Sequence, residues 1–315
     1  MRWRGRLAVA TLRALARLPD AATLALAGLL MRLSVLFRTV LYQVTRANIE
    51  HCFPEMPVAS QQALIRGSIK DDLVGGIDIA RTWCQPERAM ARVSRVSGEL
   101  EALNRCVSEG KPVVILAPHL GNWEIANFWL GQQYDFHALY KPSPMPALDQ
   151  LIRESRQHFG STLYPATGRG VAGLVRSLKK GGVTAILPDQ VAAKGGGRLA
   201  TFFGLPAWTP TLPCRLIQQS HARAFLIFVR RLADGGYEIV LRDPDPEIYA
   251  EDIDTALTAL NRSVESLVRE EPLQYNWSYK RFRMKGAQIY PASARQGRAQ
   301  KKARARGKRN DNSRE

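Results

Sequence analysis

The sequence predicts an α/β domain with a mixed central sheet flanked by helices, preceded by a membrane-associated helical segment. Short apolar, β-branched runs alternate along the chain with stretches of helical periodicity, which is the element order of α/β folds. Hydrophobic residues make up 45% and charged residues 23% of the 315 residues, as in globular proteins. Strongly basic ends enclose a nearly neutral middle, so the ends and the body are expected to have different roles.

The net charge of +17 is concentrated at the two ends of the chain. Residues 1–46 hold eight Arg and one acid, which gives a charge of +7. Residues 295–315 hold nine Lys or Arg and two acids, which also gives +7, so the residues between these two segments carry a net charge of only +3. Basic segments attract nucleic-acid phosphates and anionic lipid headgroups alike. The tail, residues 292–315, lacks apolar periodicity and is expected to be a disordered, solvated appendage without a specific partner.

Residues 1–45 are expected to form basic, membrane-associated helices. On a helical wheel four arginines (Arg2, Arg6, Arg13 and Arg17) fall within about 60° of one another, beside an apolar face, although a soluble amphipathic helix has the same pattern. The apolar run at 21–37 is interrupted by Arg32 and is just shorter than the roughly 18–20 residues of a spanning helix. We expect this segment to lie on an anionic membrane or to span it marginally.

The elements that follow belong to one predicted domain, residues 46–291. A helix is expected over 48–83. Four strands, at 112–118, 136–141, 161–166 and 183–188, alternate with helices at 121–133, 146–160 and 171–182. The apolar runs at 223–232 and 237–243 flank Gly235 and Gly236, which predicts a hairpin. A closing helix is expected at 252–269.

Cysteine and histidine usage gives little support for a disulfide or a metal site. The four cysteines are scattered (Cys52, Cys84, Cys106 and Cys214) and are expected to be reduced thiols. The five histidines form no His-Glu-x-x-His spacing, and no Cys-x-x-Cys pair is present. A metal site is therefore not expected.

The segment "APHLGNWE" carries the first candidate site. His119 follows the predicted strand at 112–118, where α/β sheets gather reactive groups. Gly121 and Asn122 allow a tight turn, after which Glu124 is expected to return toward the imidazole within the first helical turn. A carboxylate on one ring nitrogen makes the other a better general base. The alternative is a helix-capping histidine and a solvated acid at the start of a helix.

A second candidate is "GRGVAG", which matches the Gly-x-Gly-x-x-Gly pattern of dinucleotide-binding loops at Gly168, Gly170 and Gly173. Asp189, after the next strand, would then bind a ribose of NAD(P) in an oxidoreductase. Pro165 interrupts the short strand before the loop, so a plain loop and helix start is favoured. A noncatalytic lipid-binding protein is a third alternative. On the helix after "YKPSP", Arg153 and Arg156 lie on one face that suits an oxyanion or phosphate, with solvated arginines as the alternative.

Taken in order, these segments resemble the late acyltransferases of lipid A biosynthesis, within the wider His-x4-Asp/Glu glycerolipid acyltransferase group. "RANIEHCFPEM", "HLGNWE", "YKPSPMPALDQLIRESRQHFG", "ILPDQ" with "FFGLPAWTPT", and "QYNWSYKRFR" carry the resemblance, which covers about residues 46–290. Tyr279 stands where the family commonly has His, and Leu273 where it commonly has Glu.

The resemblance implies a glycerolipid acyltransferase-like fold and transfer of a fatty acyl group from acyl carrier protein, or coenzyme A, to a hydroxyl of a lipid A precursor. It implies that His119 is the general base, that Glu124 orients it, that Arg156 binds phosphate or charge, and that Asp189 holds this arginine or a sugar. Arg153 and Asn122 are further candidates to bind substrate or the oxyanion. We expect a monomer at the cytoplasmic face of the inner membrane, with anionic lipids and no nucleic acid among its partners.

Overall fold

The computed structural model describes residues 2–193, 195–283 and 289–291, so the expected tail at 292–315 lies outside the described residues. The helices are α1 (Arg2–Ala16), α2 (Asp20–Leu36), α3 (Val40–Cys52), α4 (Val58–Cys84), α5 (Pro86–Met90), α6 (Leu100–Ser108), α7 (Trp123–Gln133), α8 (Pro146–Gln157), α9 (Gly168–Leu178), α10 (Leu212–Ser220) and α11 (Ile253–Glu270), with short 3-10 turns at Pro246–Tyr249 and Pro272–Gln274. The strands are β1 (Val93–Gly98), β2 (Val113–Leu116), β3 (Phe136–Tyr140), β4 (Thr162–Pro165), β5 (Val183–Ile186), β6 (Gly197–Phe202), β7 (Leu205–Pro210), β8 (Arg223–Arg231) and β9 (Tyr237–Arg242).

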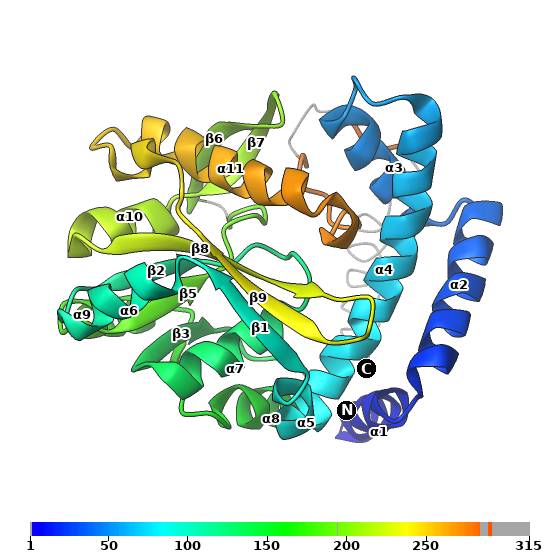
Figure 1. Ribbon diagram of the computed structural model, residues 1–315, viewed down its shortest axis with the longest axis horizontal. Coiled ribbons are helices and arrows are strands. Elements are labelled where there is room, and N and C mark those ends of the chain that lie inside the picture. The colour runs from blue at the N-terminus through cyan, green and yellow to red at the C-terminus, as the bar shows by residue number, and fades with distance from the viewer. Residues whose placement is uncertain (1, 194, 284–288, 292–315) are drawn as a thin grey trace, which may run out of the picture.

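The central sheet has seven strands in the order β1-β9-β8-β2-β5-β3-β4. The strands from β8 to β4 are mutually parallel, while β9 runs antiparallel to β8 and parallel to β1. Helices lie on both faces of this sheet, as Figure 1 shows. The expected mixed sheet flanked by helices is therefore confirmed, as are the β8–β9 hairpin and the strand positions that the apolar runs predicted.

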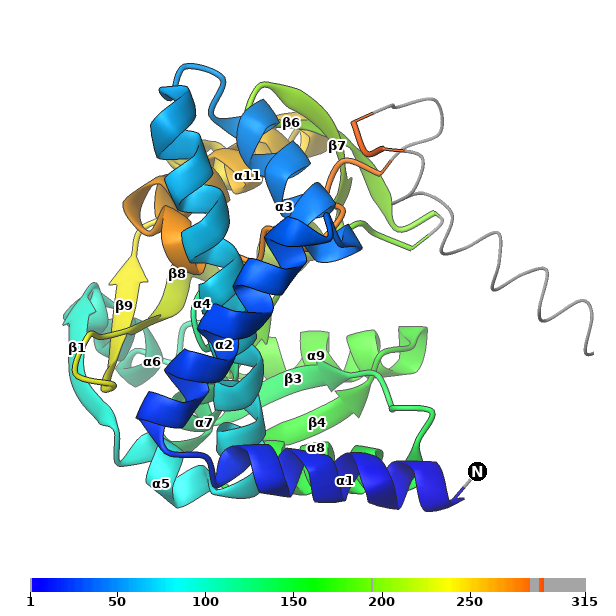
Figure 2. The ribbon, with the colours of Figure 1, turned by 90° about the vertical axis from the view of Figure 1, so that its right-hand side faces the viewer.

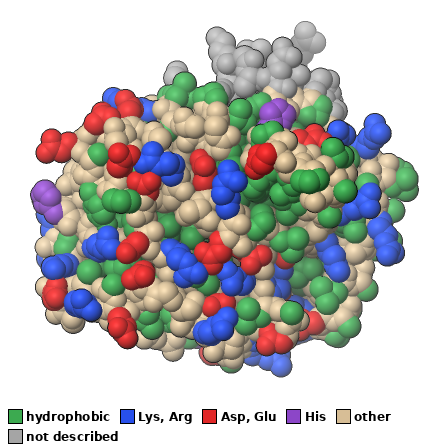
Figure 3. Space-filling view, turned by 45° about the horizontal axis from the view of Figure 1, so that its top comes forward, with side chains coloured by type: hydrophobic (Ala, Val, Ile, Leu, Met, Phe, Trp, Pro, Cys, Tyr) green, Lys and Arg blue, Asp and Glu red, His purple; other side chains and the backbone are tan. Residues whose placement is uncertain are grey.

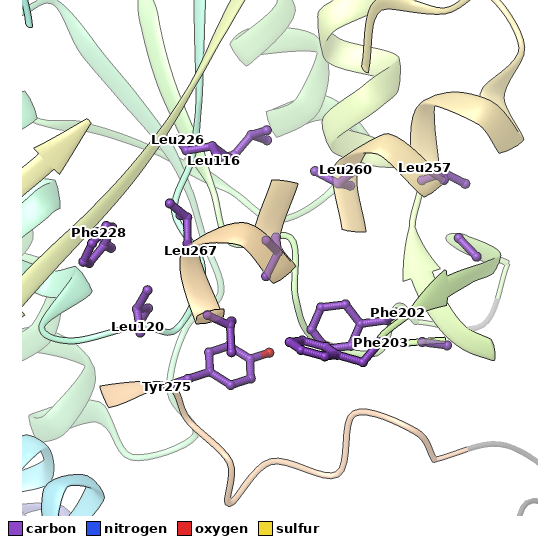
Figure 4. Packing of buried hydrophobic residues seen from close by; sticks show 14 of the residues in the cluster. Leu116, Leu120, Phe202, Phe203, Leu226, Phe228, Leu257, Leu260, Leu267 and Tyr275 are labelled. Carbon is purple, nitrogen blue, oxygen red and sulfur yellow. The ribbon is translucent and has the colours of Figure 1, made fainter. Parts of the chain in front are cut away.

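The middle strands of the sheet are apolar on both sides because each face is covered. All four residues of β2 are buried, with alternate side chains entering two separate core clusters. Figure 4 shows one of these clusters, in which Leu116 and Leu226 of neighbouring strands pack with Leu267 of α11. This packing fixes β2 and β5 as rigid supports for the loops that follow them.

The helix expected over 48–83 is two helices, α3 and α4, separated by residues 53–57. Pro54 and Pro57 cannot donate backbone hydrogen bonds, and Pro57 is the N-cap residue of α4. The hairpin β6–β7 and the elements α6 and β1 were not predicted. β6 starts at a glycine and β7 contains two prolines, and such residues are depleted in strands.

The first two helices pack against the body of the protein. α1 lies along α4 and α8, α2 lies along α4, and Figure 2 shows α1 crossing the base of the molecule before α2 rises beside α4. Helix α3 continues across residue 45, the expected boundary between an N-terminal segment and the domain. That domain division remains a prediction.

Candidate active site

His119 and Asp189 meet at the carboxyl edge of the sheet because their strands are in register. Leu116 of β2 pairs with Ile186 of the parallel strand β5. Each site residue lies three positions after its paired strand residue, so both loops reach the same place. His119 Nδ1 lies 2.8 Å from Asp189 Oδ1, and the His119 backbone N–H donates to Asp189 Oδ2 at 3.0 Å.

The carboxylate of Asp189 fixes the protonation pattern of the imidazole. Its side chain is 3% exposed, and that of His119 is 13% exposed. Burial acts to raise the pKa of Asp189, but the charge and hydrogen bonds of His119 hold this pKa below its ordinary value. An ionised carboxylate only accepts hydrogen bonds, so Nδ1 carries a proton, and in the neutral imidazole the lone pair is on Nε2.

Glu124 is paired with Arg156 and not with the imidazole. Arg156 Nε and Nη2 donate to the two carboxylate oxygens of Glu124 at 2.9 and 2.5 Å, which is a bidentate ion pair between α7 and α8. Burial acts to raise the pKa of Glu124, and the guanidinium lowers this pKa below its ordinary value. The pair therefore remains ionised in a buried position.

This arrangement corrects two expectations from the sequence. Glu124 was expected to orient His119, and Asp189 was expected to hold Arg156 or a sugar. In the structure Asp189 is hydrogen-bonded to His119, and Glu124 is hydrogen-bonded to Arg156. The first turn of α7 explains the exchange. The ring of Trp123 contacts that of His119 at a centroid distance of 4.8 Å, and Glu124, one residue further round the helix, points instead toward α8.

The two other predicted site residues lie away from the imidazole. Arg153 is exposed on α8, one turn before Arg156. Asn122 is buried and directed toward α4, where its Nδ2 donates to Thr82 Oγ1 at 3.0 Å. Asn122 therefore anchors the turn that carries His119, because its backbone N–H also donates to Val229 O.

Gly121 lets this turn pass close to the sheet. Its φ is +63°, and a Cβ atom there would lie 1.8 Å from Val229 O. The close approach is what allows the chain to leave β2, cross the end of β8 and begin α7 within a few residues. The expectation of a tight turn at Gly121 is confirmed.

Sequence reasoning did not assign a role in the site to three residues around the His119–Asp189 pair, of which Gln190 contacts the imidazole itself. Gln190 Nε2 lies 3.0 Å from His119 Nε2, and Tyr279 Oη accepts from Val191 N at 3.0 Å. Tyr275 is buried beside Asp189, and burial followed by the Asp189 charge raises the pKa of this phenol well above its ordinary value. The motifs "ILPDQ" and "QYNWSYKRFR" contain all three, but only the fold shows that they converge.

The glycine motif at Gly168, Gly170 and Gly173 has a packing role at the edge strand β4. A Cβ atom on Gly170 would lie 1.8 Å from Pro165 O, and one on Gly173 would lie 2.9 Å from the ring of Tyr164. Small residues therefore let α9 approach β4. Asp189, the residue that a dinucleotide would require for its ribose, is hydrogen-bonded to His119.

A small cavity of about 70 Å³ adjoins the Glu124–Arg156 pair. Its other walls are Ala117, Trp123, Ala126, Asn127, Phe136, Ala138, Leu139, Ala185 and Leu187. Apart from the ion pair and one amide, this lining is apolar. Within the described residues, no group of three or more His, Cys, Asp or Glu side chains is arranged to hold a metal ion, and the four cysteines are free thiols.

Comparison with known proteins places this chain in a family. The family model for bacterial lipid A biosynthesis acyltransferases matches residues 1–284. The chain belongs to this family. It is similar to the lipid A biosynthesis lauroyltransferase of Escherichia coli (strain K12), at 23% identity over 76% of this chain and 78% of that protein. It is also similar to the myristoyltransferase of that strain, at 26% identity over 74% of this chain and 72% of that protein.

Membership of the family makes the protein an acyltransferase and confirms the resemblance that its motifs indicate. The family match includes α1 and α2. In the part of the chain that the structure describes, no helix alone is long and apolar enough to cross a bilayer; α1 from Trp3 and α2 meet these criteria only together, bent by 115° at the break between them.

Proposed function

We propose that this acyltransferase moves a fatty acyl group from the thioester of acyl carrier protein to a hydroxyl of a lipid A precursor. Family membership supports the reaction class and the lipid A acceptor. The observation that carries the chemistry is the 2.8 Å hydrogen bond between His119 Nδ1 and Asp189 Oδ1, which leaves Nε2 as a base. A hydroxyl that reaches this nitrogen loses its proton as it attacks the thioester.

The proposed reaction is an acyl transfer in two steps. His119 Nε2 takes the proton of the acceptor hydroxyl while the hydroxyl oxygen bonds to the thioester carbonyl carbon. Asp189 stabilises the imidazolium that forms. The tetrahedral intermediate then collapses, the carbon–sulfur bond breaks, and the imidazolium returns its proton to the leaving thiolate. No cofactor is needed in this scheme because a thioester is already activated.

Arg156 is the proposed ligand for the negative charge of the substrate. Glu124 holds its Nε and Nη2, so the guanidinium is fixed in direction while three further N–H donors, two of them on Nη1, remain for a ligand. Glu124 follows Trp123, whose ring contacts the imidazole, and the pair lines the apolar cavity, where part of an acyl chain would lie. A phosphate of the acceptor or the developing oxyanion would meet this guanidinium.

The outer surface of the first two helices supports work at a membrane. Leu36 and Phe37, at the end of α2, are each 71% exposed. Other exposed apolar side chains on this side are Trp3, Leu7, Leu24, Leu29, Leu30, Leu33 and Val40. In Figure 3 hydrophobic and basic side chains lie together on the right, where Figure 1 places α2. Apolar side chains among arginines suit an anionic bilayer, here the cytoplasmic face of the inner membrane.

The proposal is tested by following acyl transfer from acyl carrier protein to a lipid A precursor. His119→Ala is expected to abolish transfer while the protein remains folded, because no other side chain replaces the base. His158→Ala, on exposed surface after α8, is the matched control and is expected to keep activity. Mass spectrometry of host lipids without the gene should show lipid A lacking one secondary acyl chain. Full transfer by the His119→Ala protein would overturn the proposal.

A further inference from the structure

Gln190 covers the ring nitrogen that the proposed reaction needs. Its side-chain Nε2 lies 3.0 Å from His119 Nε2. Because Asp189 is an ionised acceptor on Nδ1, the neutral imidazole has its lone pair on Nε2. The amide N–H of Gln190 therefore donates to this lone pair, and the two successive residues 189 and 190 bind the two nitrogens of one imidazole.

The main chain holds Gln190 in this place from both sides. On one side, Asp189 Oδ2 accepts from the His119 backbone N–H at 3.0 Å. On the other side, Val191 N donates to Tyr279 Oη at 3.0 Å. Gln190 itself is half-buried. Because Asp189 and Val191 are both held by hydrogen bonds, the backbone of the loop, and not only the rotamer of Gln190, directs the amide toward His119 Nε2.

We propose that Gln190 is a positioning residue that caps the base of the free enzyme until the acceptor hydroxyl replaces its amide. This inference rests on the proposed function of His119. A water molecule that is to be activated by Nε2 must donate to the same lone pair. The cap therefore protects a bound acyl thioester from hydrolysis while the acceptor is absent.

Two reactions compete for the capped nitrogen. In hydrolysis, water gives a proton to Nε2 and its oxygen bonds to the thioester carbonyl carbon; the carbon–sulfur bond breaks, and the thiolate takes the proton. The products are a fatty acid and a thiol. In transfer, the acceptor hydroxyl follows the same steps and the product is an ester. The acceptor is held by further contacts and displaces the amide more easily than water does.

Gln190→Met tests the cap because methionine keeps the side-chain length and removes the N–H donor. The rate of hydrolysis of acyl-acyl carrier protein without acceptor is compared with the rate of transfer with a lipid A precursor. The ratio of hydrolysis to transfer is expected to rise about 2- to 12-fold, the range that the net strength of one neutral hydrogen bond gives. An unchanged ratio, or a parallel fall of both rates, would overturn the inference.

Three controls separate the cap from other roles. Gln157→Met, on the exposed end of α8, should leave the ratio unchanged, and matched thermal unfolding midpoints establish that each variant folds. The ¹⁵N signal of His119 Nε2 should move in Gln190→Met and stay in Gln157→Met. In the double variant with His119→Ala, hydrolysis should fall to background; a persisting rise overturns the cap. Retained transfer in His119→Ala alone refutes the proposed function instead.

Discussion

Asp189→Asn and Glu124→Gln distinguish the two carboxylates near the imidazole. Both oxygens of Asp189 accept N–H groups of His119, from Nδ1 at 2.8 Å and from the backbone at 3.0 Å. An asparagine amide has one acceptor and one donor. In either orientation, one N–H of His119 then faces an N–H of the amide, or the ring proton moves to Nε2, where it blocks the base.

The magnitude follows from the lost charge. A carboxylate 2.8 Å from an imidazolium nitrogen contributes about 6 kcal/mol at an effective dielectric constant of 20. Losing most of this stabilisation in the transition state corresponds to a fall in kcat of about 10³- to 10⁴-fold. Glu124→Gln leaves the imidazole paired and instead weakens a buried ion pair. We expect it to cost about 3–5 kcal/mol in the free energy of unfolding and to raise KM for the acceptor.

The assay measures kcat and KM for acyl transfer to a lipid A precursor, with urea unfolding of each variant in parallel. We expect Asp189→Asn to lose most of its kcat and little stability. We expect Glu124→Gln to lose more stability and less kcat. The opposite result would be an Asp189→Asn variant with kcat within tenfold of wild type and a folded Glu124→Gln variant with a collapsed kcat. That result would refute the assignment of Asp189, and not Glu124, as the carboxylate that supports His119 in catalysis.

Two further predictions concern the membrane surface and acid stability. Replacing Leu36 and Phe37 together by Glu should lower binding to anionic lipid vesicles at least tenfold, since each apolar side chain contributes about 1.5–3 kcal/mol when fully buried in lipid. Leu199→Glu, at another exposed apolar position, on β6, is the control that should bind normally. Equal loss of binding in both variants would refute a specific membrane-binding surface. The pKa values of Glu124 and Asp189 are lowered by their partners, so their contribution to stability is complete above the ordinary carboxyl range near about pH 4 and is lost as pH falls below it. Urea unfolding midpoints between pH 7 and 3 should therefore fall less steeply in Glu124→Gln than in wild type, and parallel curves would contradict this.

The sequence predicts most of the sheet because its strands are short apolar runs between proline and glycine. The runs at 112–118 and 183–188 predict β2 and β5; all four residues of β2 are buried, and β5 is buried at Val183 and Thr184. The hairpin β6–β7 could not be predicted in the same way, because its glycine and prolines argue against a strand. Its stability comes from contact with α11, which is distant in the sequence.

The sequence predicts which charged residues belong to the site but not which of them are hydrogen-bonded to each other. Spacing along the chain makes Glu124 the natural partner of His119, since only four residues separate them. The actual partner, Asp189, is 70 positions away and becomes a neighbour only if β2 and β5 are adjacent, parallel and in register. The order of strands in a sheet follows from packing across the whole domain, and a single sequence does not display it.

The observed pairing also determines which carboxylate would stabilise the imidazolium that forms when His119 takes a proton in the proposed reaction. Glu124 is already neutralised by the bidentate contact with Arg156, so its charge stabilises an imidazolium less than an unpaired carboxylate would. Asp189 instead accepts hydrogen bonds from the Nδ1–H and the backbone N–H of His119, and Tyr275 also hydrogen-bonds to it. In the proposed reaction, charge formed on the imidazole is therefore stabilised by Asp189, while Glu124 holds the guanidinium of Arg156 in place. Two acids near one histidine thus have different partners, one the imidazole and the other the arginine, and we expect their substitutions to have different effects.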